Sequence, residues 1–142
     1  MGGGDASDAQ RAVAEDVGRL LAEAGAVVVT GGLTGVMEAA SKGAREAGGT
    51  TLGILPGADR RDANPWVEVA VPTGMGEARN ALVVRSADAV VAVGGEWGTL
   101  SEIAFARKTG KPVVGVESWD LDGVERFETA PEAVAAVLRR LG

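Results

Sequence analysis

Two patterns of apolar residues alternate along the chain. Short runs rich in valine are typical of strands that are buried on both faces of a parallel sheet. Longer segments with apolar residues three or four positions apart predict amphipathic helices. Strands are expected over residues 26–30, 50–55, 67–71, 88–93 and 111–116, and helices over residues 8–24, 36–47, 77–87, 99–110 and 131–141. This alternation predicts a three-layer α/β/α sandwich with a mostly parallel sheet, and the polar segments 58–66 and 118–127 are expected to be loops.

The size and composition of the chain fit one domain, residues 1–142, with 46% hydrophobic residues to form a single core. The chain has 14 basic and 20 acidic residues, a net charge of −6, and no cluster of lysine or arginine. We therefore expect no nucleic-acid partner. Arg85 and Asp88 interrupt the longest apolar stretch, so no membrane span is expected, and the absence of a signal-peptide pattern predicts a cytoplasmic protein.

Cysteine and histidine are both absent from the sequence. Their absence excludes thiol nucleophiles, Ser-His pairs and the usual zinc sites, so no metal site is expected. Any chemistry must depend on carboxylates, arginine, lysine, hydroxyls or the backbone.

The glycine-rich turn at residues 2–4 precedes a helix, but no strand precedes the turn. In a doubly wound sheet the first strand is central, and its loss would leave a hole in the core. We expect either that this strand lies in residues missing before Gly2 or that the turn is only a flexible end.

Two further glycine-rich turns follow predicted strands, at residues 31–35 and 94–99. The glycines could be present only because they permit a tight turn. However, two such turns after parallel strands open on the same edge of the sheet, where free amides and helix dipoles attract anions. We therefore expect a small phosphate-bearing ligand there. The residues predicted to bind it are Gly31, Gly32, Thr34, Gly35, Gly94, Gly95, Trp97, Gly98 and Thr99.

Three side chains near these turns allow more than one interpretation. Thr99 and Glu102 have the spacing of a capping box, so Glu102 is either structural or functional. In the first turn of a helix, Glu102 would be kept ionised by the dipole. Arg79 begins a helix, where its charge opposes the dipole, which favours a functional role. Trp97 would either stack on a ligand ring or pack against a neighbouring loop or subunit.

The order of these motifs resembles the LONELY GUY family, once described as lysine decarboxylases. Residues 93–102 resemble its Pro-Gly-Gly-x-Gly-Thr-x-x-Glu motif, residues 31–37 its Gly-Gly-x-x-Gly-Leu-Met loop, and residues 77–80 its Glu-Arg-Lys segment. The resemblance implies a Rossmann-like fold and a homodimer or higher homo-oligomer. It also implies that Arg79 and Glu102 would cleave the N-glycosidic bond of a nucleoside 5′-monophosphate, which releases the free base and ribose 5-phosphate.

Val93, Asn80 and Glu96 depart from the family motifs, and the chain is short. In these features it looks closer to a compact subgroup that includes molybdenum-cofactor carrier proteins. For that subgroup the resemblance implies a bound nucleotide or molybdopterin-type ligand, with no cofactor required. We therefore predict ligand binding at the glycine turns, with phosphoribohydrolase activity as the alternative. A purely structural subunit, which no nucleotide would protect from unfolding, is the third interpretation.

Overall fold

A computed structural model describes residues 1–142 of the chain. The strands are β1 (Val28–Thr30), β2 (Thr51–Leu55), β3 (Val69–Pro72), β4 (Val90–Val93), β5 (Val113–Val116) and β6 (Glu125–Phe127). The α-helices are α1 (Asp8–Glu23), α2 (Val36–Glu46), α3 (Arg79–Ser86), α4 (Trp97–Lys108) and α5 (Ala130–Leu141), and two short 3-10 helices are η1 (Arg60–Asp62) and η2 (Gly76–Ala78).

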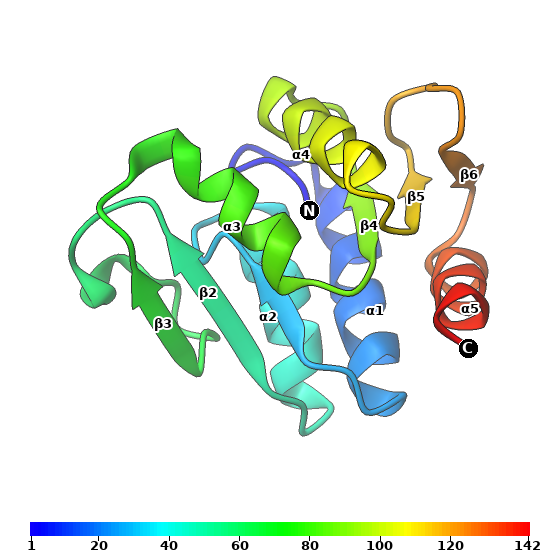
Figure 1. Cartoon of the computed structure of the whole chain (residues 1–142). Helices are drawn as coiled ribbons and strands as arrows, with labels where there is room; N and C mark the ends of the chain where they lie inside the picture. Colours follow the sequence, from blue (N-terminus) through cyan, green and yellow to red (C-terminus); the bar gives the residue numbers. More distant parts are fainter.

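All strand pairs are parallel, and the strands form two three-stranded sheets, β1-β2-β3 and β4-β5-β6. The two sheets lie side by side, and the N-terminus of the chain lies between them (Figure 1). The backbone of Met1 bonds to β4 of the second sheet: its amino group donates a hydrogen bond to Val91 O (2.6 Å), and Val93 N–H donates to Met1 O (2.7 Å). The predicted parallel α/β architecture is confirmed, but the sheet is divided at its centre.

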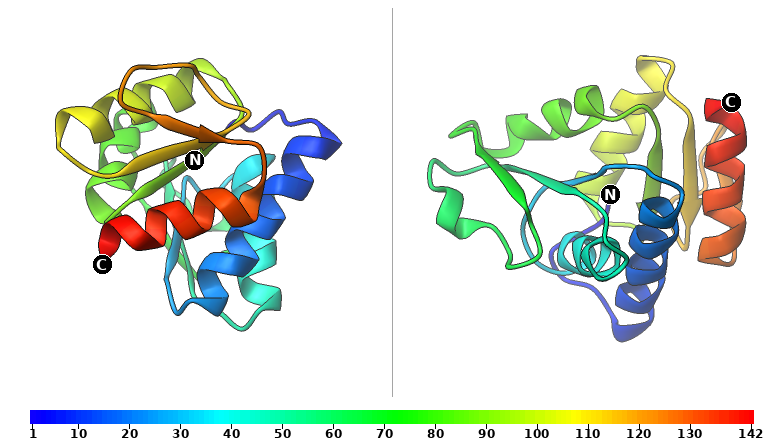
Figure 2. Two further views of the ribbon diagram at one scale, coloured as in Figure 1. Left: turned by 90° about the vertical axis from the view of Figure 1, so that its right-hand side faces the viewer. Right: turned by 90° about the horizontal axis from the view of Figure 1, so that it is seen from below.

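Helices cover both faces of the sheets, which confirms the three layers (Figure 2). The side chains of β4 alternate between the two faces, as strand geometry requires. Val91 and Val93 pack in a core cluster with α1, α2 and α5. Val90 and Ala92 pack in a second cluster with α3 and α4. The valine run of β4 is therefore buried on both faces.

One interpretation of the sequence and one prediction about local structure are wrong. The capping box at Thr99 and Glu102 does not form, because α4 begins two residues earlier, after Glu96. Thr99 therefore lies inside the first turn, and its hydroxyl caps no amide. The predicted loop 118–127 ends in β6, a strand whose exposed Glu125 and Arg126 give no apolar run that could have indicated it.

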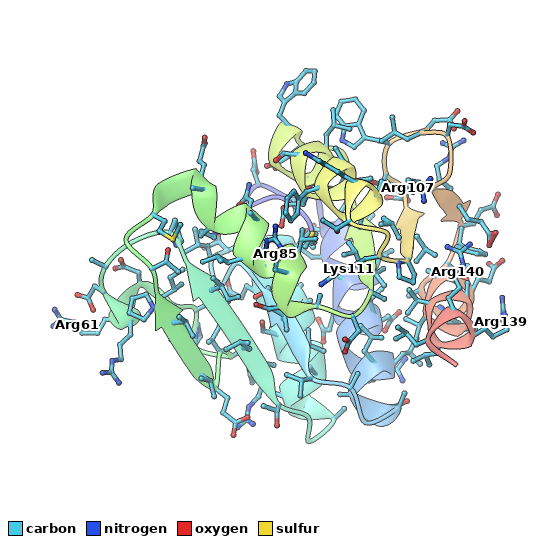
Figure 3. The ribbon with its side chains drawn as sticks, in the orientation of Figure 1. Arg61, Arg85, Arg107, Lys111, Arg139 and Arg140 are labelled. Carbon is cyan, nitrogen blue, oxygen red and sulfur yellow. The ribbon has the colours of Figure 1, made fainter.

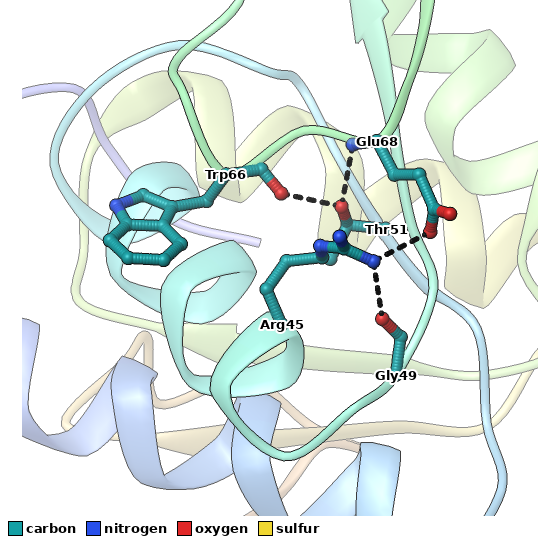
Figure 4. A network of polar contacts seen from close by, with 5 residues as sticks. All are labelled: Arg45, Gly49, Thr51, Trp66 and Glu68. Atoms are coloured by element: carbon teal, nitrogen blue, oxygen red, sulfur yellow. Dashed lines mark hydrogen bonds and ion pairs between the residues drawn. The ribbon is translucent and has the colours of Figure 1, made fainter.

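A polar network fixes the start of β3 against β2 (Figure 4). Thr51 Oγ1 donates a hydrogen bond to Trp66 O (2.6 Å) and accepts one from Glu68 N–H (2.8 Å). Arg45 Nη1 donates to Glu68 Oε2 (3.0 Å) and to Gly49 O (3.3 Å). The network positions β3, which leads through η2 into α3.

Helix α3 is fixed at its other end by Lys111 (Figure 3). Its ammonium group donates hydrogen bonds to Val84 O (2.7 Å), Arg85 O (2.9 Å) and Ala87 O. A cation at the last carbonyls of a helix is favoured by the helix dipole as well as by these bonds. Both ends of the segment that carries Arg79 are therefore anchored.

Candidate functional site

A cavity of about 260 Å³ opens at the carboxyl ends of β1 and β4. Its wall is formed by residues 1–4, the turn after β1, the start of α3 and the first turns of α4. The cavity thus lies across the division between the two sheets. This is the edge where the two predicted glycine turns were expected to meet, and it is the usual ligand position in parallel α/β folds.

Five of the predicted site residues line this cavity: Gly31, Arg79, Gly98, Thr99 and Glu102. The other predicted residues lie in the same turns but outside the wall of the cavity. They are Gly32, Thr34, Gly35, Gly94, Gly95 and Trp97.

Thr34 and Gly35 support the wall from behind. Thr34 Oγ1 donates a hydrogen bond to Gly4 O (3.0 Å), and Val36 N–H donates to Gly3 O (3.0 Å). Gly35 has a positive φ of 68°, and a Cβ there would lie 2.3 Å from Gly3 O. Only glycine permits this approach, so the turn after β1 holds the N-terminal turn in place.

The N-terminal turn itself is part of the wall, which the sequence did not lead us to expect. Gly2, Gly3 and Gly4 line the cavity, and none of their amides donates a hydrogen bond within the protein. The sequence shows the same pattern here as at the other two turns, a run of glycines directly before a helix. Three such turns, rather than two, converge on the cavity.

Thr99 is the third residue of α4 and is 2% exposed, and its Oγ1 has no hydrogen-bond partner. The first backbone hydrogen bond of the helix runs from Leu100 N–H to Glu96 O (3.0 Å). The amides before Leu100 are therefore free, as at any helix N-terminus. Free amides, a helix dipole and an unpartnered hydroxyl together form an anion-binding arrangement.

Arg79, the first residue of α3, is 9% exposed. One terminal nitrogen donates to Asn80 Oδ1, and the buried Nε has no partner. Burial lowers the pKa of Arg79, and Glu102 and Glu77 oppose that shift, but a guanidinium stays protonated in proteins. Gly31 makes room for it, since a Cβ there would lie 2.7 Å from Arg79 Nη2.

Glu102 is 8% exposed, and burial raises its pKa, with the Met1 amino group and Arg79 opposing the shift. The expectation that Glu102 lies in the first turn of a helix, where the dipole would favour its ionised form, is wrong. Glu102 is the sixth residue of α4, and the effect of the dipole fades beyond the first turn. Glu102 can therefore carry a proton at a pH where an exposed glutamate is ionised.

The Glu96 carboxylate lies over the N-terminal turn. A Cβ on Gly3 would lie 1.9 Å from Glu96 Oε1, and Asp5 N–H donates to the same oxygen at 3.4 Å. Glu96 is exposed, so it can move away without disturbing the core. In this structure a carboxylate of the protein lies where the free amides would attract an external anion.

Trp97 lies outside the cavity and is 77% exposed. Its ring is 5.3 Å from that of Trp119 at a tilt of 41°, and Trp119 Nε1 donates to Glu96 O (3.2 Å). Of the two expectations for Trp97, this conformation shows the contact with a neighbouring loop.

Of the cationic side chains labelled in Figure 3, Arg61 lies at one end of the molecule and Arg139 and Arg140, on α5, lie at the other. Arg61 is paired with Asp59 (2.8 Å) and Arg140 with Glu125 (3.3 Å).

None of the helices is both long and apolar enough to cross a bilayer. No group of three or more acidic residues lies close enough together to hold a metal ion.

Residues 1–139 match the model of the SLOG cluster4 family. The chain belongs to this family. An uncharacterised protein of Archaeoglobus fulgidus is 43% identical over 136 residues, which cover 94% of this chain and 89% of the relative.

Two solved structures resemble this SLOG cluster4 chain closely. The molybdenum cofactor binding protein of the phototrophic bacterium Rippkaea orientalis is 36% identical with a TM-score of 0.95, over 100% of this chain and 94% of that one. The molybdenum cofactor carrier protein of Chlamydomonas reinhardtii is 36% identical with a TM-score of 0.91, over 99% of this chain and 94% of that one. The predicted resemblance to the compact, carrier-like subgroup is confirmed.

Proposed function

We propose that this protein binds the molybdenum cofactor, or a related phosphate-bearing pterin, in the cavity between the two sheets. The observation that carries the proposal is the buried Thr99 hydroxyl without a partner, beside free amides and Arg79. A buried polar group without a hydrogen bond costs about 1–3 kcal/mol, and a phosphate oxygen would remove that cost. The molybdenum cofactor proteins described above support the choice of ligand.

The amides of residues 2–4 and of the first turn of α4, together with Thr99 and Arg79, would hold the phosphate. The cavity of about 260 Å³ is slightly below the roughly 300–1,000 Å³ of typical ligand pockets, so the pterin ring would extend beyond its rim. The molybdenum would travel as cargo. Because the chain has no cysteine or histidine, it offers neither thiolate nor imidazole to the metal, and recognition would depend on the phosphate and the ring.

Acidic residues control the affinity in this proposal. Glu77, Glu96 and Glu102 line the cavity together with a single arginine. An anionic ligand would displace the Glu96 carboxylate and would favour the protonated form of Glu102. Affinity for the ligand should therefore rise as the pH falls through the raised pKa of Glu102.

The test is to express the protein in cells that make the cofactor and to measure the pterin that copurifies, by fluorescence after oxidation. Thr99→Val keeps the side-chain shape but removes the hydroxyl. We expect an affinity lower by about ten- to a hundredfold, because a hydrogen bond to a charged group contributes about 1.5–3 kcal/mol. Glu96→Gln should bind more tightly than the wild type. Absence of pterin from the wild type, or equal occupancy in Thr99→Val, would contradict the proposal.

Hydrolysis of nucleoside 5′-monophosphates is the second candidate, and the buried Glu102 favours it. A carboxyl with a raised pKa can donate a proton to the departing base, a role for which the sequence alone indicated no residue. Incubation with AMP, followed by chromatography, tests for release of adenine. Activity in the wild type but not in Glu102→Gln would support an enzyme, and no release by either protein would exclude this reaction.

A further inference from the structure

A second cavity adjoins the first one along α4. It has a volume of about 190 Å³ and lies between the start of α3 and the middle of α4. Glu77, Asn80 and Glu102 line both cavities. Taken together, the two volumes of about 260 Å³ and about 190 Å³ reach the roughly 300–1,000 Å³ of typical ligand pockets, which the first cavity alone does not. A ligand whose phosphate occupies the first cavity therefore has room for its ring in the second.

The two cavities follow one another along α4. Thr99, Glu102 and Phe105 are spaced three residues apart, so each side chain is a neighbour of the next on the surface of the helix. Thr99 lines the first cavity only, Glu102 lines both, and Phe105 lines the second only. At 1.5 Å per residue, Thr99 and Phe105 are about 9 Å apart along the helix axis. A ligand held by its phosphate at the start of α4 would extend past Glu102 toward Phe105.

The apolar part of the second cavity is formed by Phe105, Ala78 and Ala81. Phe105 is partly buried. Arg85, which Figure 3 labels on α3, places the central carbon of its guanidinium 5.2 Å from the centre of the Phe105 ring and so holds this ring against α3. The remaining residues of the wall are polar. The cavity therefore suits a flat ring with polar groups at its edge.

The side-chain amide of Asn80 has a defined orientation. Its Oδ1 accepts a hydrogen bond from a terminal nitrogen of Arg79, and a guanidinium can only donate, so the oxygen must lie on that side. The Nδ2 group faces across to α4, where a Cβ on Gly98 would lie 4.0 Å from it. Asn80 therefore presents N–H donors at the boundary between the two cavities.

Glu77 presents acceptors beside these donors. It precedes Asn80 by three residues in the continuous helical segment of η2 and α3, so the two side chains are neighbours. Glu77 is exposed and takes part in none of the ion pairs of the protein. A carboxylate has two oxygens that accept and no group that donates. Together the two residues offer a ligand two acceptors and one donor group.

We propose that the second cavity binds a fused 2-amino-4-oxopyrimidine ring, the ring system that pterins and guanine share, and that Glu77 and Asn80 recognise its edge. This inference rests on the proposed function, because the phosphate anchors the ligand in the first cavity. The edge of such a ring carries an amino group, a ring N–H and a carbonyl oxygen in that order. The Glu77 carboxylate accepts from the first two, and Asn80 Nδ2 donates to the third.

Adenine presents a different edge, on which an amino group lies beside a ring nitrogen that only accepts. This nitrogen would face the Glu77 carboxylate, which also only accepts. A site built for hydrogen bonds strongly rejects a ligand that leaves those bonds unmade. GMP, IMP and AMP are therefore a matched set of probes, because they carry the same sugar and phosphate and differ only in this edge.

The first test is titration calorimetry of the protein with these three nucleotides. We expect GMP to bind about tenfold more tightly than IMP, which lacks the amino group, and AMP to bind most weakly. Equal affinities for the three would overturn the inference and leave the phosphate site in place. Absence of binding by all three would contradict the phosphate site itself and overturn both.

Glu77→Gln and Glu96→Gln separate recognition of the ring from the charge of the site. Each variant removes one negative charge from the wall of the first cavity, but only Glu77 also lines the second. The ratio of the affinities for GMP and AMP isolates the ring, because the phosphate is common to both. We expect Glu77→Gln to lower this ratio by about tenfold. Glu96→Gln, the matched control, should leave the ratio unchanged.

Asn80→Asp tests the donor. The variant keeps an oxygen for Arg79 but has no N–H group to donate to the carbonyl of the ring. We expect it to lower the ratio of the affinities for GMP and AMP as well. An unchanged ratio in both Glu77→Gln and Asn80→Asp would overturn the inference.

The ligand bound in cells distinguishes the two sources of this ring. Protein expressed in cells that make the molybdenum cofactor is denatured, and the released small molecules are separated by chromatography. We expect a pterin, detected by its fluorescence after oxidation. A guanine nucleotide would support recognition of this edge but contradict the pterin of the proposed function. An adenine nucleotide would overturn the inference while the phosphate site stands.

Discussion

At the scale of single residues, burial has the largest effect on the pKa of Glu102. Two positive groups, the Met1 amino group and Arg79, lie near enough to favour the ionised carboxylate, yet burial has the larger effect and the pKa is raised. A carboxyl that binds its proton more tightly leaves the cavity less negative at a pH where an exposed glutamate is fully ionised. Such a cavity admits an anion more easily, which is consistent with a phosphate site.

The raised pKa predicts how stability depends on pH. The folded state binds the Glu102 proton more tightly than the unfolded state does, so this residue contributes stability below its ordinary pKa. That contribution is lost as the pH rises through the raised value. Glu102→Gln cannot ionise, so we expect it to unfold a few degrees above the wild type at pH 8 and at the same temperature as the wild type near pH 4. Thermal unfolding across this range measures the difference.

Glu46→Gln is the matched control, because Glu46 is exposed on α2 and should show no such trend. A Glu102→Gln variant that is less stable than the wild type at pH 8 would show that the carboxylate is ionised and stabilising there.

The sequence indicated Arg79, Thr99 and Glu102 because each follows the end of a predicted strand or begins the next helix. The sequence could not indicate which of these side chains lacks a hydrogen-bond partner or has a shifted pKa. The unpartnered hydroxyl of Thr99 and the raised pKa of Glu102 depend on what covers them, and residues distant in the sequence provide that cover. Gly31, for example, is required beside Arg79 only because α3 packs against the turn after β1.

At the scale of elements, α1 and α2 pack with their backbones in contact. A Cβ on Gly18 would lie 1.9 Å from Ala40 O, and a Cβ on Gly43 would lie 1.9 Å from Glu15 O. Each helix contributes one glycine, and each glycine makes room for the backbone of the other helix. This packing brings the turn before α1 close to the N-terminus of α2, where it forms the wall of the cavity.

Gly43→Ala should therefore destabilise the protein, although alanine alone favours a helix by about 1 kcal/mol over glycine. The added methyl group would force the helices apart, and we expect a net loss of about 2 kcal/mol, or about 6 °C in the unfolding temperature. Calorimetry measures the loss. Asp16→Ala on the exposed face of α1 is the control and should be close to neutral. A Gly43→Ala variant more stable than the wild type would show that the helices separate at little cost.

Apolar residues predicted α1, α2 and α5 and five of the six strands closely. Most of these elements bury a regular apolar pattern, although β3 leaves Val69 and Val71 exposed. The prediction failed where the pattern is weak. β6 has two exposed charged residues out of three, and the start of α4 lies among glycines and an exposed tryptophan. The division of the sheet is a property of the whole chain that no single element reveals.

At the scale of the whole molecule, the cavity lies where the two halves meet. Gly31 and Met37 belong to the half built on β1-β2-β3, and Gly98 and Thr99 belong to the half built on β4-β5-β6. A ligand that contacts both halves would connect them at an edge where no strand pairing does so. Binding and stability should therefore be coupled.

This coupling predicts that a phosphate-bearing ligand protects both halves together. AMP serves as a stable probe: at a concentration 100 times its Kd, it should stabilise the protein by about 2.7 kcal/mol, or about 8 °C. Hydrogen exchange should slow at the amides of residues 2–4 and also at those of Gly98 and Thr99. At the same AMP concentration Thr99→Val should show a smaller rise in unfolding temperature. Protection confined to one of the two turns would mean that the phosphate contacts only one half, and the cavity would then not act as a bridge between the sheets.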